Sequence, residues 1–335
     1  MKPTPVFDTY WRFAAKRMEV FHRRREDDHG PWCDDQILSR YRFTNVYRAT
    51  DRVSQYLIKE VQYRGDRSQE PVELFFRTLL FKIFNRVDTW ESLEQRLGPI
   101  AWHGLDKAEL VDALDDLMRM GRRVYSAAYI MPSPRYGYAR KHANHVAMLA
   151  AMIADKLPEQ ISEATSLKRV YELLLSYPGM GPFLAFQYAI DLNYSAMLDF
   201  GEDGFVVAGP GALDGIAKCF EDGKDLDPAE TIYEMVARQP DEFTRLGLTF
   251  DGLFGRALQP IDCQNLFCEI SKYARVAHPD VKGVLDRSRI KQSYKPDHRP
   301  MGDLMFPPKW ALDVPVRSPR TLASRKRSGL QLSLI

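Results

Sequence analysis

One segment near the middle of the chain constrains the fold more than any other. Residues 173–189 read Leu-Leu-Leu-Ser-Tyr-Pro-Gly-Met-Gly-Pro-Phe-Leu-Ala-Phe-Gln-Tyr-Ala, a Pro-Gly-x-Gly turn between two apolar runs of helical spacing. Gly179 and Gly181 allow a tight turn and leave backbone N–H groups uncovered where the second helix begins, and the dipole of a helix favours a phosphate there. An ordinary helix–turn–helix packing corner is the alternative reading. The apolar flanks and the acids that follow favour a hairpin for a nucleic-acid backbone, with Met180 and Phe183 in the contact set.

The composition is that of a globular protein whose core needs no disulfide or metal. The chain has 335 residues and a net charge of +2. Its four cysteines are scattered without C-x-x-C spacing, and we see no apolar run of the roughly 18 residues that a transmembrane helix needs. Residues 121–145 carry four arginines, one lysine and two histidines and no acid. We therefore expect a cytoplasmic protein with a basic surface that follows phosphates, although a solvated charged face is an equal alternative for that segment.

Helical periodicity dominates, so the sequence predicts an all-α fold. The expected helices cover residues 7–25, 72–86, 90–97, 106–120, 141–156, 166–176, 182–193, 210–220, 228–237 and 259–276. Residues 1–280 would form one helical domain, or two helical lobes with a cleft between them. Residues 281–335 are rich in Pro, Arg and Ser, and we expect an extended or partly disordered basic arm.

Two further segments combine side chains that suit a polar site. If residues 42–52 are helical, one face carries Asn45, Arg48 and Arg52 and another carries Thr44, Tyr47 and Asp51. We place Asn45, Tyr47, Arg48 and Asp51 in a base pocket, with a polar network between helices as the alternative. On the 259–276 helix, Gln264, Cys268 and Lys272 line one stripe with Asn265 and Glu269 beside it, and a ligand or an internal network must pair these groups.

The loop 129–138 is the candidate wedge. Its prolines exclude a helix, yet it is aromatic and apolar and has basic neighbours, so Met131 and Tyr136 could insert into a duplex or stack on an extruded base. A cover for the core is the alternative. His142 and His145 are read as polar residues rather than metal ligands, since no cysteine or acid stands near them in sequence.

The run 175–185 resembles the Leu-Pro-Gly-Val-Gly-x-x-Thr-Ala hairpin of the helix–hairpin–helix DNA glycosylase superfamily. That resemblance implies a glycosylase-like helical fold and a catalytic aspartate about twenty residues after the second glycine. Asp203 lies 22 residues after Gly181 and Asp199 lies 18 after it, with Glu202 as a further candidate. Phe183 stands where bifunctional members carry the Schiff-base lysine, which implies a monofunctional enzyme.

The runs 42–52, 202–212 and 262–273 resemble a narrower group: the alpha-glutamyl/putrescinyl thymine pyrophosphorylase clades and the helical domain of 5-hydroxymethyl-deoxyuridine DNA kinase. This resemblance implies action on hypermodified bases in phage-type DNA. Members include amino-acid:DNA transferases and a bacteriophage replication inhibition DNA glycosylase that removes glucosylated hydroxymethylcytosine. The sequence has no G-x-x-x-x-G-K-[ST] loop, so P-loop kinase chemistry is not expected from it.

From these resemblances we expect a monofunctional DNA glycosylase. It would bind double-stranded DNA as a monomer, flip a bulky modified base such as glucosylated hydroxymethylcytosine and leave an abasic site, in anti-phage defence. Asp203 would stabilise the developing sugar cation, and no metal or organic cofactor is expected. The first alternative is an amino-acid:DNA transferase acting on pyrophosphorylated 5-hydroxymethyl-dU, with Glu269 as candidate for the amine pocket. The second is a DNA-binding module without catalysis.

Overall fold

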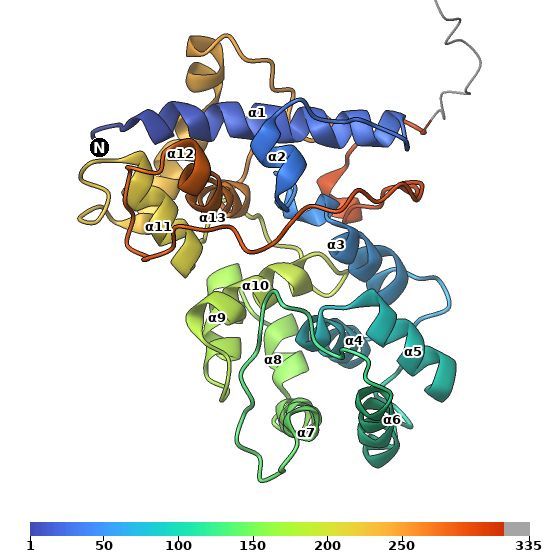
Figure 1. Cartoon of the computed structure of the whole chain (residues 1–335). Helices are drawn as coiled ribbons and strands as arrows, with labels where there is room; N and C mark the ends of the chain where they lie inside the picture. Colours follow the sequence, from blue (N-terminus) through green and yellow to red (C-terminus); the bar gives the residue numbers. More distant parts are fainter. Residues whose placement is uncertain (318–335) are drawn as a thin grey trace, which may run out of the picture.

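The computed structural model describes residues 1–317, and these residues form an all-α protein, as the sequence predicts (Figure 1). No strand occurs among them, only isolated bridges such as Tyr41 with Ser293. The helices are α1 Pro5–Glu26, α2 Gln36–Arg40, α3 Arg52–Tyr56, α4 Pro71–Phe84, α5 Val87–Leu97, α6 Lys107–Arg119, α7 Lys141–Ala154, α8 Leu157–Ser162, α9 Leu167–Leu175, α10 Pro182–Asn193, α11 Pro210–Cys219, α12 Pro228–Arg245 and α13 Pro260–Ala277, with short turns η1 Arg48–Thr50, η2 Leu57–Gln62 and η3 Pro308–Trp310.

The helices contact one another in two groups. The first comprises α1, α2 and α11 to α13, and the second comprises α4 to α10. Figure 1 shows the first group in the upper half of the molecule and the second in the lower half, with the C-terminal segment crossing between them. The boundary predicted at residue 280 remains a prediction, and so do the two lobes as separate folding units.

Helix α12 continues beyond the predicted end at residue 237 and passes through Pro240. Proline lacks the N–H that would bond to the carbonyl four residues earlier, which usually ends a helix. Here the amide nitrogen of Gln239 donates to the Val236 carbonyl at 2.8 Å, so the acceptor left free by Pro240 is satisfied. The same amide exchanges hydrogen bonds with the backbone of Leu258, which ties α12 to the segment before α13.

Residues 42–52 do not form one helix, so the two faces inferred for such a helix do not exist. Residues 42–47 are not helical, and only η1 and α3 follow. The reason is local: the Asp51 carboxylate accepts the Asn45 backbone N–H at 2.9 Å, and the Asn45 amide donates to the Thr50 carbonyl. Short polar side chains that bond to nearby backbone compete with helix formation in this way.

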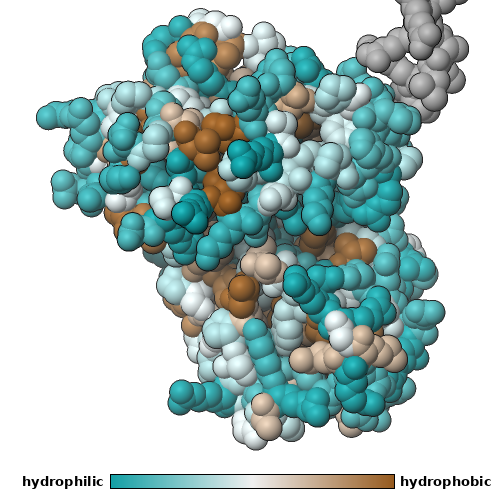
Figure 2. Space-filling model, viewed as in Figure 1, coloured by the Kyte–Doolittle hydropathy of each residue, from teal (hydrophilic) through white to brown (hydrophobic). Residues whose placement is uncertain are grey.

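In the described residues after α13 the only helical turn is η3, and this segment packs on the helices, while the extended basic arm remains a prediction. Phe306 is buried, and Lys309 donates to the Asn193 side chain at 2.8 Å. The remainder of the predicted basic arm, residues 318–335, lies outside the described residues. Within residues 1–317 no helix has both the length and the apolar character to cross a bilayer. The face in Figure 2 is mainly hydrophilic, with separate hydrophobic patches.

Candidate functional site

A cavity of about 640 Å³ lies where the hairpin, the 42–48 segment and α13 meet; we call it the central cavity. Three segments that the sequence analysis singled out therefore converge on one site. Its lining is Arg42, Phe43, Thr44, Arg48, Arg86, Arg123, Tyr125, Ser126, Ala127, Ala128, Tyr129, Phe183, Gln187, Gln264, Asn265, Cys268, Glu269, Lys272, Arg287 and Gln292. The volume is within the usual range of small-molecule sites, roughly 300–1,000 Å³.

The hairpin supplies one ring of the aromatic pair in the central cavity. Gly179 has φ +88°, a conformation that favours glycine, and Gly181 is the N-cap of α10 without any side-chain cap. Two residues on, the Phe183 ring stacks on Tyr129 at 5.9 Å with planes 6° apart. A Cβ on Gly209 would come within 2.4 Å of the Phe183 ring, so the start of α11 holds this ring in place.

A buried ionic cluster lies beside the central cavity and joins its lining through Arg48; we call this side of the cavity its floor. Asp191 on α10 has no exposed surface, pairs with Arg48 and lies 3.2 Å from the ammonium of Lys82 on α4. Arg48 and Lys82 also lie 5.5 and 4.8 Å from the centre of the Tyr129 ring. Burial lowers the pKa of Lys82 to about 8, although Asp191 opposes that shift. One carboxylate thus holds two cations beneath the aromatic pair.

The side of the central cavity that α13 forms carries predicted ligand-binding side chains, and some of them also bond to other parts of the protein. Glu269 pairs with Lys272 at 2.8 Å and accepts the Thr44 backbone N–H at 3.1 Å. Asn265 donates to the Asn45 and Val46 carbonyls and accepts from the Thr44 hydroxyl, so its amide serves the internal network. Gln264 donates to the sulfur of Cys268 at 3.1 Å. The structure therefore places Gln264, Asn265, Glu269 and Lys272 on the cavity, as a site requires.

The charge of the lining is strongly unequal. Among residues 1–317 its cations are Arg42, Arg48, Arg86, Arg123, Lys272 and Arg287, while Glu269 is its one acid. A concave site that is lined by charges of one sign raises the local concentration of ligands of the opposite charge. The central cavity therefore suits an anion, such as a phosphate group, beside an aromatic ring.

The three predicted catalytic acids do not line the central cavity. Asp203 and Asp199 are exposed. Glu202 is buried, pairs with Arg256 at 2.9 Å and lies beneath the C-terminal segment, where Arg256 stacks on Trp310. Burial raises the pKa of Glu202, and Arg256 acts in the opposite direction. These acids were selected because they follow Gly181 by about twenty residues. The loop 194–209, on which they lie, does not bring them to the cavity lining.

The wedge prediction also differs from the structure. Met131 has no exposed surface and belongs to the core, so it cannot enter a duplex. Tyr136 is partly buried, and its backbone N–H donates to Asn144. The large hydrophobic residues of this segment that reach solvent are Ile130 and Tyr138. Tyr129 is the aromatic residue of the loop that reaches the central cavity.

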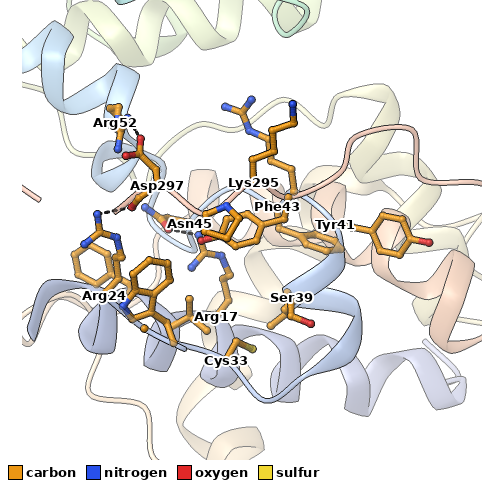
Figure 3. Close-up of a pocket in the computed structure, with 18 of the residues that line it drawn as sticks. Arg17, Arg24, Cys33, Ser39, Tyr41, Phe43, Asn45, Arg52, Lys295 and Asp297 are labelled. Atoms are coloured by element: carbon orange, nitrogen blue, oxygen red, sulfur yellow. Dashed lines mark hydrogen bonds and ion pairs between the residues drawn. The ribbon is translucent and has the colours of Figure 1, made fainter. Parts of the chain in front are cut away.

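Asn45, Asp51 and Tyr47 lie away from the central cavity. The first two line a neighbouring cavity of about 990 Å³ between α1, α2 and the C-terminal segment (Figure 3). Arg17 of α1 donates to Asn45 there, and Arg52 pairs with Asp297. Burial raises the pKa of Asp51 to about 6. Tyr47 is buried and donates to the Arg256 carbonyl at 2.5 Å. The two cavities share Arg42, Phe43, Ala127 and Gln292 in their linings.

Several residues of the lining were not among the predicted site residues. Gln187 lies four residues after Phe183 on α10, so helical spacing from the hairpin could have indicated it. Tyr129 was part of the wedge loop but was not selected. Arg86 and Arg287 come from loops that are far apart in sequence, and no local pattern links them to Arg123, which lies in the basic segment 121–145.

Asp262, beside Glu202, gives a prediction for pH dependence. Burial raises its pKa to about 8 in the folded protein, from an ordinary value of 3.8. The folded state keeps this proton while the unfolded state loses it, so the contribution is fully present below pH about 4 and is lost as the pH rises toward 8. Asp262→Asn keeps an acceptor for the Gln259 N–H. We expect its urea midpoint relative to wild type to rise between pH 5 and pH 8; a constant difference across this range would contradict the assignment.

The pattern of the family described as "5-hmdU DNA kinase, helical domain" matches residues 4–283. The chain belongs to this family. Among curated proteins, the 5-hmdU DNA kinase of Bacillus phage SP10 is 26% identical over 289 residues, which cover 80% of this chain and 45% of the relative. The matched region of this helical-domain family thus spans a little under half of the relative's length. No solved structure matches the chain significantly.

These findings overturn the expected glycosylase. The family and the phage relative are named for a DNA kinase, which is a transferase, whereas a glycosylase is a hydrolase. Base excision, hydrolysis and an abasic product are therefore wrong as the main function. The structure agrees, because the acids proposed for excision do not line the central cavity. The narrower of the two sequence resemblances, to the 5-hydroxymethyl-deoxyuridine DNA kinase helical domain, is confirmed.

Proposed function

We propose that this chain acts in the hypermodification of thymine in DNA. It binds duplex DNA that carries a base derived from 5-hydroxymethyl-deoxyuridine, takes that base into the central cavity and transfers an amino compound onto it. The single observation that carries this proposal is the composition of the central cavity. The cavity is lined by an aromatic pair, several cations and a carboxylate. It lies beside a hairpin of the type that can bind a phosphate.

The aromatic pair suits an extruded base. Enzymes that modify a base in duplex DNA must turn it out of the stack, and stacking on aromatic side chains offsets the loss, at about 1–3 kcal/mol per base. Phe183 lies at the start of α10, next to the N-terminus that we assign to the DNA backbone. A nucleotide held there by its phosphate would bring its base to the ring of Phe183 or Tyr129.

The cationic lining suits a pyrophosphate leaving group on the base methylene. In the proposed step the nitrogen of the amine attacks the 5-methylene carbon, and a C–N bond forms as the C–O bond to pyrophosphate breaks. Pyrophosphate departs with the electron pair, toward Lys272, Arg123 and the other cations of the lining. The amine loses a proton in the process. Glu269 is the carboxylate on the cavity that can hold the amine and accept that proton.

The relative's name raises phosphorylation of the base as the other outcome. This chain contains no G-x-x-x-x-G-K-[ST] motif, and the match spans 45% of the relative. Both reactions require recognition of DNA and of the modified base, so binding alone cannot distinguish them. The group that is transferred to the base does.

The test uses a duplex with one pyrophosphorylated 5-hydroxymethyl-dU and, as amine donors, labelled glutamate and putrescine. We expect label in the DNA and release of one pyrophosphate for each amine transferred. Glu269→Gln should reduce transfer at least tenfold while duplex binding stays near wild type, since a general base contributes about 10²–10⁴-fold to rate. Transfer of labelled phosphate from ATP to 5-hydroxymethyl-dU instead would assign the chain to the kinase step. Affinity no greater for the modified duplex than for thymine DNA, without transfer, would refute the proposal.

A further inference from the structure

Two polar groups on the floor of the central cavity have no hydrogen-bond partner among residues 1–317, the part of the chain that the structure describes. They are the amide oxygen Oε1 of Gln187 and the guanidinium nitrogen Nη1 of Arg48. Both residues line the cavity, although only 1% of Gln187 and 2% of Arg48 is exposed. Buried polar groups are nearly always paired, and leaving one unpaired costs about 1–3 kcal/mol. Two such groups at one cavity indicate a ligand that satisfies them.

Both groups are more buried than the aromatic pair, and both belong to residues close to Asp191. Phe183, Gln187 and Asp191 follow at steps of four on α10, so they share one face of the helix. Arg48 is bound to Asp191 at the inner end of that face. Phe183 at the outer end is only partly buried. A base stacked on Phe183 or Tyr129 would therefore point its hydrogen-bonding edge toward Gln187 and Arg48.

We propose that Gln187 and Arg48 read the Watson–Crick edge of a uracil-type base. The Gln187 oxygen accepts from N3–H, and the Arg48 guanidinium donates to the neighbouring carbonyl O4. This inference rests on the proposed function, and it names the residues that select the base. Asn265, another amide on the lining, is already bonded to Thr44 and to backbone carbonyls, whereas the acceptor of Gln187 is free.

The chemistry of Arg48 makes the reading selective. Cytosine carries an amino group in place of O4 and an acceptor at N3. The Gln187 amide could turn over to match that N3, but a guanidinium only donates and would face the amino group of cytosine. A site built to hydrogen-bond one group rejects an analogue that leaves its buried polar groups unpaired. The floor therefore favours 5-hydroxymethyl-dU over 5-hydroxymethyl-dC.

The experiment compares duplexes that contain one 5-hydroxymethyl-dU, one 5-hydroxymethyl-dC or thymine, with 2-aminopurine beside the site to report extrusion. We expect wild type to bind the dU duplex at least tenfold more tightly than the dC duplex. Gln187→Met has a similar volume but no acceptor, and it should bring the ratio close to one. Its urea midpoint should stay equal or rise, because the change removes an unpaired buried group. Gln187→Glu retains an acceptor that cannot become a donor by turning over, so it should keep or widen the ratio.

The outcomes separate this inference from the proposed function. A folded Gln187→Met that keeps the wild-type ratio overturns the inference, and so does a wild type that prefers both modified duplexes to thymine DNA equally; the proposed function stands in either case. A wild type that binds no modified duplex better than thymine DNA overturns the proposed function, and the inference falls with it only where thymine and dC duplexes are also bound equally. A large fall in the urea midpoint of Gln187→Met would show that Gln187 has a structural role instead.

Discussion

Asp191→Asn is expected to lower the free energy of unfolding by about 3–5 kcal/mol, the usual cost of removing one partner from a buried ion pair. Asp191 is fully buried and holds the cations of Arg48 and Lys82. An asparagine keeps the shape but leaves both cations without a counter-charge. Urea unfolding at pH 7, followed by circular dichroism, measures the change.

The control for this prediction is an apolar replacement of the whole cluster. A triple variant with Asp191→Leu, Arg48→Met and Lys82→Met should regain most of the stability lost in Asp191→Asn, since well-packed apolar groups often match a buried ionic cluster. The loss in Asp191→Asn should also shrink at pH 9. Burial already lowers the pKa of Lys82 to about 8, so without Asp191 this lysine becomes neutral more readily. Unchanged stability in Asp191→Asn would mean that the cluster does not hold the floor together.

The sequence predicts α10 with its observed bounds because the signals for that helix are local. Gly181-Pro182 marks the start, since proline suits the first helical position, and the apolar run continues to Asn193. Residues 42–47 show the opposite case. Their spacing fits a helix, but the hydrogen bonds of Asn45 with Asp51 and Thr50 override it, and these bonds are not visible in a periodic pattern.

The candidate site could be predicted only in part, for a related reason. The hairpin, the 42–52 run and the 262–273 run were each selected, and the structure brings members of all three to the central cavity. Their partners come from elsewhere: Asp191 lies 143 residues from Arg48. For Asp203 the spacing from Gly181 defines a distance along the chain but not the side of the molecule on which the carboxylate lies. The loop that carries Asp203 has no periodic pattern from which the direction of its side chains could be predicted, and Asp203 does not line the central cavity.

Gly181→Asp is expected to weaken binding to duplex DNA by roughly a hundredfold at low salt, because it places a negative charge where the N-terminus of α10 would receive a phosphate. Gly181 is the N-cap of α10 with φ −74°, and a Cβ at this position meets nothing within 4 Å. Aspartate is a favoured N-cap residue, so the variant should fold as well as wild type or better. The loss would therefore report on binding alone.

Gly181→Asn is the matched control, since asparagine caps a helix equally well and has nearly the same size but no charge. We expect it to bind DNA within a few-fold of wild type, and we expect the difference between the two variants to shrink as salt rises, because screening weakens the repulsion between carboxylate and phosphate. Fluorescence anisotropy with a labelled duplex at several salt concentrations gives both affinities. Equal affinity of Gly181→Asp and Gly181→Asn at low salt would remove the hairpin from the DNA interface. In that case the cationic lining of the central cavity would bind the DNA backbone without the hairpin. Replacing both Arg86 and Arg123 by neutral residues would then abolish DNA binding, whereas Gly181→Asp would not.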